Sequence, residues 1–247
     1  MKIFEDIQYS EFEETKLDVY IPEKEQFPVF VYFHGGGLVN GDKKEGFIEY
    51  LVKKGVCVVS AQYRMYPGAK YPDFIADAAS AVAWTKNNIS SYGTSEGIFV
   101  GGSSAGAYLS MMLCFDKKYL AKRGMSNADI AGYYHDAGQP TTHFNVMGER
   151  GEDTRRVVID EAAPIYHISD KEVYPPMEIV VSDNDMANRY EQTMLLVSTL
   201  KHFGHDMDKI VLNIQKNSTH CSYVSRIDNG KSVFADMVYE FIRSRSC

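Results

Sequence analysis

The chain alternates between short apolar runs that predict strands and longer amphipathic stretches that predict helices. Residues 17–21 alternate apolar and polar side chains, which is typical of a strand with one wetter face, and residues 3–9 are expected to pair with them. Residues 28–33 and 56–61 are continuous apolar runs, as expected of central strands covered on both faces. Further strands are predicted at 97–102, 130–134, 177–181 and 210–214.

Apolar positions three and four residues apart predict helices between these strands. Asp42 and Glu45 are spaced like a capping pair that opens a helix, and Gly55 lies where its C-terminal cap belongs. Strands alternating with helices predict an α/β fold, with a mostly parallel eight-stranded sheet covered by helices on both faces. Further helices are predicted near 74–84, 108–113, 190–200 and 233–242.

Length and composition favour a single domain over residues 1–247, because 45% of the residues are hydrophobic and no change in composition marks a linker. The net charge of −7 disfavours nucleic acid or an anionic membrane as a partner. Residues 1–8 include Glu5 and Asp6 and so lack the core of a signal peptide, and no run approaches the ~18 apolar residues of a membrane span. We therefore expect a soluble, cytoplasmic protein.

Four cysteines are far apart in the sequence and lack the paired spacing of a zinc site. They are too few for a disulfide scaffold in a chain of this length. Buried free thiols and no metal site are therefore expected. The four are Cys57, Cys114, Cys221 and Cys247.

Candidate chemistry starts at residues 102–106, Gly-Ser-Ser-Ala-Gly, which follow an apolar strand and precede an apolar helix. The Gly-x-Ser-x-Gly pattern is typical of a nucleophile elbow, a strained turn that exposes a serine hydroxyl beyond the end of a sheet. We assign Ser104 as the nucleophile, because in the frame of Ser103 the closing position is Ala105 instead of glycine. A pattern this short can also arise by chance. It indicates a nucleophile only if an acid, a base and oxyanion donors for Ser104 are found in other loops.

A general base for Ser104 is expected beyond the carboxyl end of the last strand. His202 and His205 lie at the opposite edge of the predicted sheet, whereas His220 follows residues 210–214 in a polar loop. His220 is therefore the candidate base, against the simpler interpretation of a solvent-exposed loop histidine.

The acid should follow the preceding strand, where Asp183 and Asp185 are both available. We favour Asp185, with Asp183 forming the turn, although a helix N-cap near Met186 would also explain Asp185.

Charge that develops on a substrate carbonyl requires fixed donors, and a glycine run after the strand at 28–33 offers them. The amides of Gly36, Gly37 and Ala105 form the predicted oxyanion hole. His34 is interpreted as an anchor of the glycine loop and Asp42 as a helix cap, not as catalytic groups.

With these residues in place the chain resembles the α/β-hydrolase superfamily, and within it bacterial carboxylesterases of the hormone-sensitive-lipase-like and feruloyl or acetyl esterase type. The resemblance implies a serine hydrolase that cleaves small-molecule carboxylic esters through an acyl-enzyme on Ser104, without metal or organic cofactor. The stretches that carry it are 34–37, 41–42, 63–67, 71–72, 81–84, 102–106, 185–192 and 219–220.

The resemblance has departures, one of which bears on the substrate. Ala107 stands where the family often has glycine, and Met65 and Tyr66 stand where it often has Leu-Ala. The first strands begin almost at once, which leaves no room for a helical N-terminal cap, so a lid-like cover is expected from the polar segment 139–160. A polar cover favours short-chain or sugar-linked acyl esters. Alternatives are a formamidase or peptidase with the same triad, or a catalytically inactive hydrolase-fold binding module.

Overall fold

The computed structural model describes residues 1–245, and eight strands form its central sheet. These are β1 (Lys2–Gln8), β2 (Lys16–Ile21), β3 (Gln26–Phe33), β4 (Cys57–Ala61), β5 (Thr94–Ser103), β6 (Gly132–Asp136), β7 (Met177–Asn184) and β8 (Ile210–Thr219). Their order across the sheet is β1-β2-β4-β3-β5-β6-β7-β8. β2 pairs antiparallel with β1 and β4, and every other pair is parallel. The predicted mostly parallel, eight-stranded sheet is confirmed.

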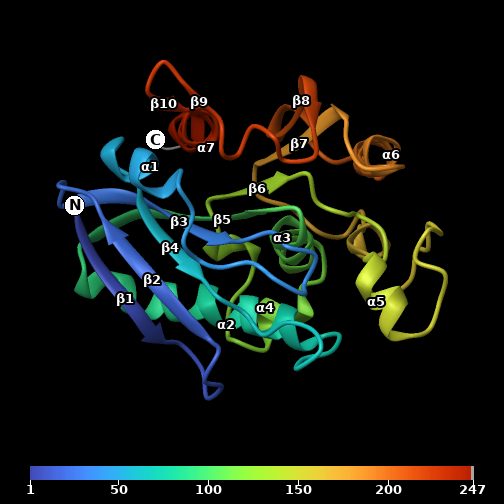
Figure 1. Ribbon diagram of the computed structural model, residues 1–247, viewed down its shortest axis with the longest axis horizontal. Coiled ribbons are helices and arrows are strands. Elements are labelled where there is room, and N and C mark those ends of the chain that lie inside the picture. The colour runs from blue at the N-terminus through green and yellow to red at the C-terminus, as the bar shows by residue number, and fades with distance from the viewer. Residues whose placement is uncertain (246–247) are drawn as a thin grey trace.

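Helices cover both faces of this sheet (Figure 1). They are α1 (Ile48–Lys53), α2 (Asp73–Asn88), α3 (Ala105–Phe115), α4 (Lys118–Ala121), α5 (Phe144–Glu149), α6 (Arg189–His202) and α7 (Val233–Arg245). α1 and α7 lie together on one side, whereas α2 and α3 pack on the other. A two-stranded hairpin, β9 (Ile227–Asp228) and β10 (Lys231–Ser232), precedes α7. Within residues 1–245, no helix combines the length and apolar character that a bilayer span requires.

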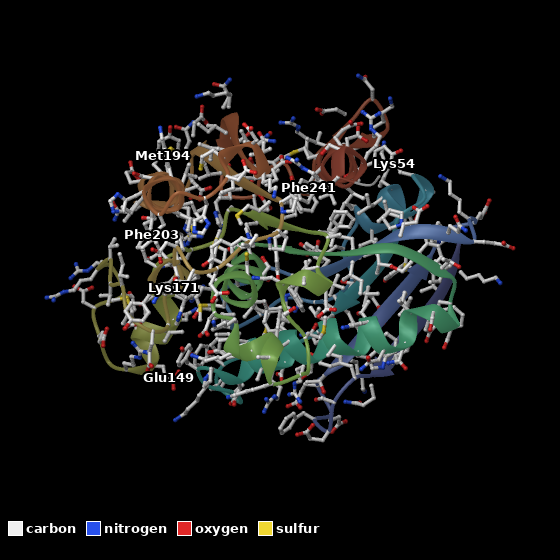
Figure 2. All side chains as sticks on the ribbon, turned by 180° about the vertical axis from the view of Figure 1, so that it is seen from behind. Lys54, Glu149, Lys171, Met194, Phe203 and Phe241 are labelled. Atoms are coloured by element: carbon white, nitrogen blue, oxygen red, sulfur yellow. The ribbon has the colours of Figure 1, made fainter. Side chains whose placement is uncertain are left out.

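Alternate residues of the central strands supply two separate cores. Val29 and Val31 of β3 join the core beneath α2 and α3, whereas Phe30 points into the core beneath α1 and α7. Successive strand side chains point to opposite faces, so a strand buried on both faces must be apolar throughout. On the second face Phe241, labelled in Figure 2, packs from α7 edge-on against Phe99 of β5, with ring centroids 6.0 Å apart.

The predicted capping pair before α1 is wrong. The helix begins at Ile48, and the Asp42 carboxylate instead accepts a hydrogen bond from the backbone amide of Lys44 (2.8 Å). The cause is the buried ammonium of Lys43, which lies 3.0 Å from the Asp18 carboxylate on β2. Residues 42–45 are therefore irregular, with a bend at Lys43, and the helix begins only after them.

The prediction of buried free thiols is confirmed for two of the three cysteines that the structure describes. Cys57 and Cys114 are buried free thiols, and Cys221 is free but only partly buried. Cys247 lies outside the described residues.

The turn from β5 into α3 leaves no space for a side chain at either of its two glycines. A Cβ placed on Gly106 would lie 1.9 Å from the carbonyl oxygen of Phe33, at the end of β3. A Cβ on Gly102 would lie 2.5 Å from both that oxygen and the carbonyl carbon of Gly106. Real Cβ atoms cannot approach backbone this closely, so only glycine allows α3 to start directly against β3 and β5.

We expect Gly106→Ala to lower the free energy of unfolding by at least ~2 kcal/mol, because the added methyl overlaps the Phe33 carbonyl. Gly148→Ala in α5 is the matched control. Its Cβ would meet only Thr154 Cγ2 at 3.5 Å, so the higher helix propensity of alanine should stabilise by up to ~1 kcal/mol. Denaturant unfolding measures both variants, and equal changes would contradict this account of the turn.

Candidate active site

Ser104 occupies the turn between β5 and α3 in a strained backbone conformation. Its φ of 55° and ψ of −112° lie in a region that L residues rarely adopt. Its backbone amide donates to the carbonyl oxygen of Asp136 on β6 (2.7 Å), which fixes the turn to the sheet. The side chain is partly exposed, whereas that of the competing Ser103 is buried.

Three sequence-predicted residues form one chain of hydrogen bonds. The Ser104 hydroxyl lies 2.8 Å from Nε2 of His220, and Nδ1 of His220 lies 2.6 Å from Oδ1 of Asp185. A carboxylate only accepts, so Nδ1 carries the proton and Nε2 is left to accept from Ser104. His220 follows β8 and Asp185 follows β7, so both side chains come from the carboxyl edge of the sheet.

Asp185 is held as a charged acceptor. Its carboxyl group also accepts from the backbone amides of Ser182 (3.2 Å) and Met186 (2.7 Å). Burial alone would raise the pKa of Asp185, but the hydrogen bond and charge of His220, with these two amides, lower it overall. The carboxylate therefore stays ionised beside the imidazole. It does not cap the following helix, which begins at Arg189.

Asp183 has a different partner set from Asp185. Its carboxylate accepts from the backbone amides of Asn217 (3.0 Å) and Ser218 (3.2 Å), near the end of β8. These bonds fix the start of the loop that carries His220. The structure therefore brings Asp185, and not Asp183, to the imidazole.

The glycine loop after β3 lies directly over the elbow. A Cβ on Gly35 would lie 3.5 Å from Cβ of Ser104, and Gly36 and Gly37 both have positive φ. Among the described residues, the amides of Gly36, Gly37 and Ala105 have no hydrogen-bond acceptor. Fixed amide donors without an acceptor are what an oxyanion hole requires, so this role stays a prediction for the three amides.

His34 anchors the base of this loop, as its simpler interpretation predicted. Its ring stacks on Tyr63 with centroids 4.4 Å apart, and its Nδ1 lies 2.7 Å from the Gly35 carbonyl. Burial lowers the pKa of His34, with smaller opposing contributions from the Gly35 carbonyl and Asp42, so the ring is neutral.

Sequence reasoning missed Asn145, whose side-chain amide donates to the carbonyl oxygen of Gly37. Asn145 lies on α5, within the segment expected to overhang the site, and its neighbour Phe144 lines the cavity at Ser104. The far end of α5 is also tied down, because Glu149, labelled in Figure 2, accepts from the Tyr66 hydroxyl (2.6 Å). The segment thus fixes the glycine loop from outside.

Asp136 was also missed, although it lies at the end of β6 beneath the site. It is fully buried and accepts a hydrogen bond from the Tyr223 hydroxyl, in the turn that follows His220. The thiol of Cys221 lies 3.9 Å from its other oxygen. Burial raises the pKa of Asp136 to about 6, against the opposing effects of the Tyr223 hydrogen bond and the His220 charge. Asp136 therefore links β6 to the loop that carries His220.

A cavity of about 360 Å³ opens onto Ser104 and His220. The glycine loop forms one wall, Phe144 and Met186 form an apolar wall, and Glu45 adds a carboxylate. Within residues 1–245, no group of three or more histidine, cysteine or acidic side chains is placed to hold a metal ion.

A mostly parallel sheet with a strained serine after β5, an acid after β7 and a histidine after β8 defines an α/β hydrolase. The family model BD-FAE matches residues 17–147, which is more than half of the chain. The protein therefore belongs to the BD-FAE family. The matched region contains the glycine loop and Ser104, and ends before Asp185 and His220.

Curated relatives share parts of this chain. A probable isoprenylcysteine alpha-carbonyl methylesterase of Arabidopsis thaliana is 32% identical over 125 residues, covering 49% of this chain and 30% of the relative. A kynurenine formamidase of Danio rerio is 35% identical over 112 residues, covering 44% and 37%. Esterase LipC of Mycobacterium tuberculosis is 26% identical over 196 residues, covering 70% and 48%. The chain spans less than half the length of each of these three relatives.

Solved structures share the fold over the full chain. A truncated carbohydrate esterase from gut microbiota has a TM-score of 0.80 at 17% identity, covering 100% of this chain and 97% of that one. A hyperthermophilic esterase of Pyrobaculum calidifontis has a TM-score of 0.78 at 20% identity, covering 100% and 87%. At these identities the likeness establishes the fold alone.

Asp136 keeps its proton to higher pH in the folded protein than in the unfolded chain. The free energy of unfolding of the wild type therefore falls as the pH rises toward the folded-state pKa of about 6. We expect the stability of Asp136→Asn relative to the wild type to rise by ~2 kcal/mol between pH 4 and pH 7.5. Denaturant unfolding at both pH values measures this difference, with Asp228→Asn on the exposed hairpin as control. Parallel stability curves for D136N and the wild type would contradict it.

Proposed function

We propose that the protein is a serine carboxylesterase that hydrolyses its substrates through an acyl-enzyme on Ser104. The observation that carries this proposal is the hydrogen-bonded chain from the Ser104 hydroxyl through His220 to the ionised Asp185. Membership of the BD-FAE family and the esterase names of several relatives support the same chemistry.

In the first half of the reaction, Ser104 Oγ attacks the ester carbonyl carbon while its proton passes to Nε2 of His220. Asp185 orients the ring through Nδ1–H and stabilises the imidazolium that forms. The amides of Gly36, Gly37 and Ala105 hold the charge that develops on the carbonyl oxygen. Collapse of the tetrahedral intermediate breaks the ester C–O bond, and the leaving alcohol takes the proton from Nε2.

In the second half, water replaces the alcohol. His220 accepts a proton from the water, whose oxygen attacks the acyl carbon, and the same amides again hold the oxyanion. Ser104 leaves with the proton from Nε2, and the acid product is released. The reaction uses one water and restores the starting hydrogen bonds.

Short-chain or sugar-linked acyl esters, such as acetyl or feruloyl esters, suit the site cavity. Its volume of about 360 Å³ lies at the low end for a small-molecule site. We infer that the polar segment 139–160, which contributes Phe144 to the lining of the cavity, acts as its cover and favours substrates dissolved in water over an oil interface.

A second candidate is cleavage of a formamide or another amide by the same three residues. The match to the zebrafish kynurenine formamidase, 35% identical over 112 residues, is the observation behind this candidate. The nucleophile and base would act alike, but a leaving amine needs the proton from His220 more strongly than a leaving alcohol does.

We expect Ser104→Ala to lower kcat/KM for 4-nitrophenyl acetate by roughly 10⁴-fold or more and to abolish labelling by a fluorophosphonate, because the attacking oxygen is lost. Ser103→Ala is the matched control, since it removes the neighbouring hydroxyl, and it should keep labelling. Nitrophenol release and the labelled fraction measure both variants.

Two outcomes would redirect this proposal. Labelling lost in Ser103→Ala and retained in Ser104→Ala would show that the other serine is the nucleophile, and no labelling in the wild type would favour an inactive binding module. Faster turnover of an N-formyl anilide than of its matched formate ester would favour the amide-cleaving alternative.

Asn145→Ala should lower kcat by about tenfold with a smaller change in KM, because the glycine loop loses the donor that fixes the Gly37 carbonyl. The control is Asn127→Ala, whose side-chain amide donates to the Cys114 carbonyl (2.8 Å) away from the site cavity. Steady-state kinetics with 4-nitrophenyl butyrate measure kcat and KM for both variants. An equal loss of kcat in both variants would assign Asn145 to general stability.

A further inference from the structure

A second cavity, of about 490 Å³, adjoins the one at Ser104. The two share Phe144 and Met186 as lining residues, so these side chains separate the reacting carbonyl from the second space. Three arginines line the second cavity, and no acidic residue is among its described lining residues: Arg155, Arg156 and Arg189. We name this space the arginine cavity.

Arg189 is the buried member, with 4% of its surface exposed. Its guanidinium donates to the carbonyl oxygen of Ala137 and to Oε1 of Gln139 (3.4 Å). Within residues 1–245 it forms no ion pair, and the Asp185 carboxylate, which is paired with His220, acts on it only from a longer distance. A buried cation without a paired anion is costly, and neutral acceptors offset only part of that cost. A negative group in the cavity would complete its environment.

Arg155 and Arg156 reach the same cavity from the segment that follows α5. The Arg155 guanidinium is paired with the Asp153 carboxylate through two 2.8 Å bonds, so its charge is largely balanced. Arg156 has no such carboxylate partner in the part of the chain that the structure describes. Guanidinium groups thus line the arginine cavity from two separate segments. Arg189 is buried and Arg156 is exposed.

The site cavity itself has the opposite charge. Glu45 lines it but does not line the arginine cavity. The negative group of an acidic substrate bound at Ser104 is therefore repelled by Glu45. It is attracted toward the arginine cavity, beyond Phe144 and Met186. The charges define one orientation for such a substrate.

We propose that the arginine cavity is a subsite for a carboxylate group carried by the ester substrate, so that the enzyme prefers esters bearing a negative charge remote from the scissile bond. The inference rests on the proposed function for turnover, because the scissile carbonyl must lie at Ser104. Binding of a carboxylate in the cavity does not require turnover. Guanidinium groups match carboxylates in shape and hydrogen-bond geometry.

The test compares esters that differ only in this charge. On the acyl side these are 4-nitrophenyl hydrogen adipate and its methyl ester, and on the alcohol side 4-acetoxybenzoate and its methyl ester. We expect the kcat/KM ratio of anionic to neutral substrate to exceed one for at least one pair. Arg156→Gln should lower that ratio about three- to tenfold, and 0.5 M NaCl should lower it in the wild type.

Arg123→Gln is the control for net charge, because it removes an exposed arginine that lines neither cavity and should leave the ratio unchanged. Arg155→Gln should change the ratio less than Arg156→Gln, since Asp153 already balances its charge. A wild-type ratio below one for both pairs, or equal ratios in R156Q and R123Q, would overturn the proposal.

A binding measurement keeps this inference separate from the proposed esterase activity. Benzoate should raise the Tm of the wild type more than neutral benzamide does, and Arg156→Gln should remove the difference. If no ester is hydrolysed but this difference appears, the esterase proposal fails and the carboxylate site stands. If neutral esters are hydrolysed and benzoate acts like benzamide, the carboxylate site fails alone.

Discussion

The close approach of α3 to the end of β3 determines most of what lies at this edge of the sheet. Because Gly106 and Gly102 have no side chains, the helix starts against the Phe33 carbonyl and the intervening turn must strain at Ser104. The chain that leaves Phe33 is the glycine loop, which therefore passes directly over the strained serine. The contact of α3 with the Phe33 carbonyl thus brings the Ser104 hydroxyl and the glycine loop to the same edge of the sheet.

The sequence was most informative where local pattern decides structure. Apolar runs and alternation located the eight strands, and the order of strands then indicated that Ser104, Asp185 and His220 would share an edge. The cap assigned to Asp42 failed because Lys43 is drawn inward by Asp18, on a strand more than twenty residues earlier. That long-range ion pair overrides a spacing which in isolation favours a helix start.

The residues that sequence reasoning missed share a physical reason. Asp136 meets Tyr223 across 87 positions, and Asn145 meets Gly37 across 108. Neither pair belongs to a motif with fixed spacing, so only the folded sheet brings the partners together. The burial of Arg189 could not be predicted either, because an arginine at the start of a helix is normally exposed to solvent. In the structure it is buried beneath the loop after β6.

Asp183 joins the ends of β7 and β8 through its hydrogen bonds to Asn217 and Ser218. Asn217 and Ser218 shortly precede His220 in the chain, and Asp183 itself shortly precedes Asp185. The separation of Asp185 and His220 is therefore set by the ladder between two neighbouring strands and not by the helix that connects them along the chain. α6 and the turn after it can then vary in length, or accept an inserted segment, while the imidazole and its carboxylate keep their spacing. This edge of the molecule is a place where related chains can diverge without rebuilding their chemistry.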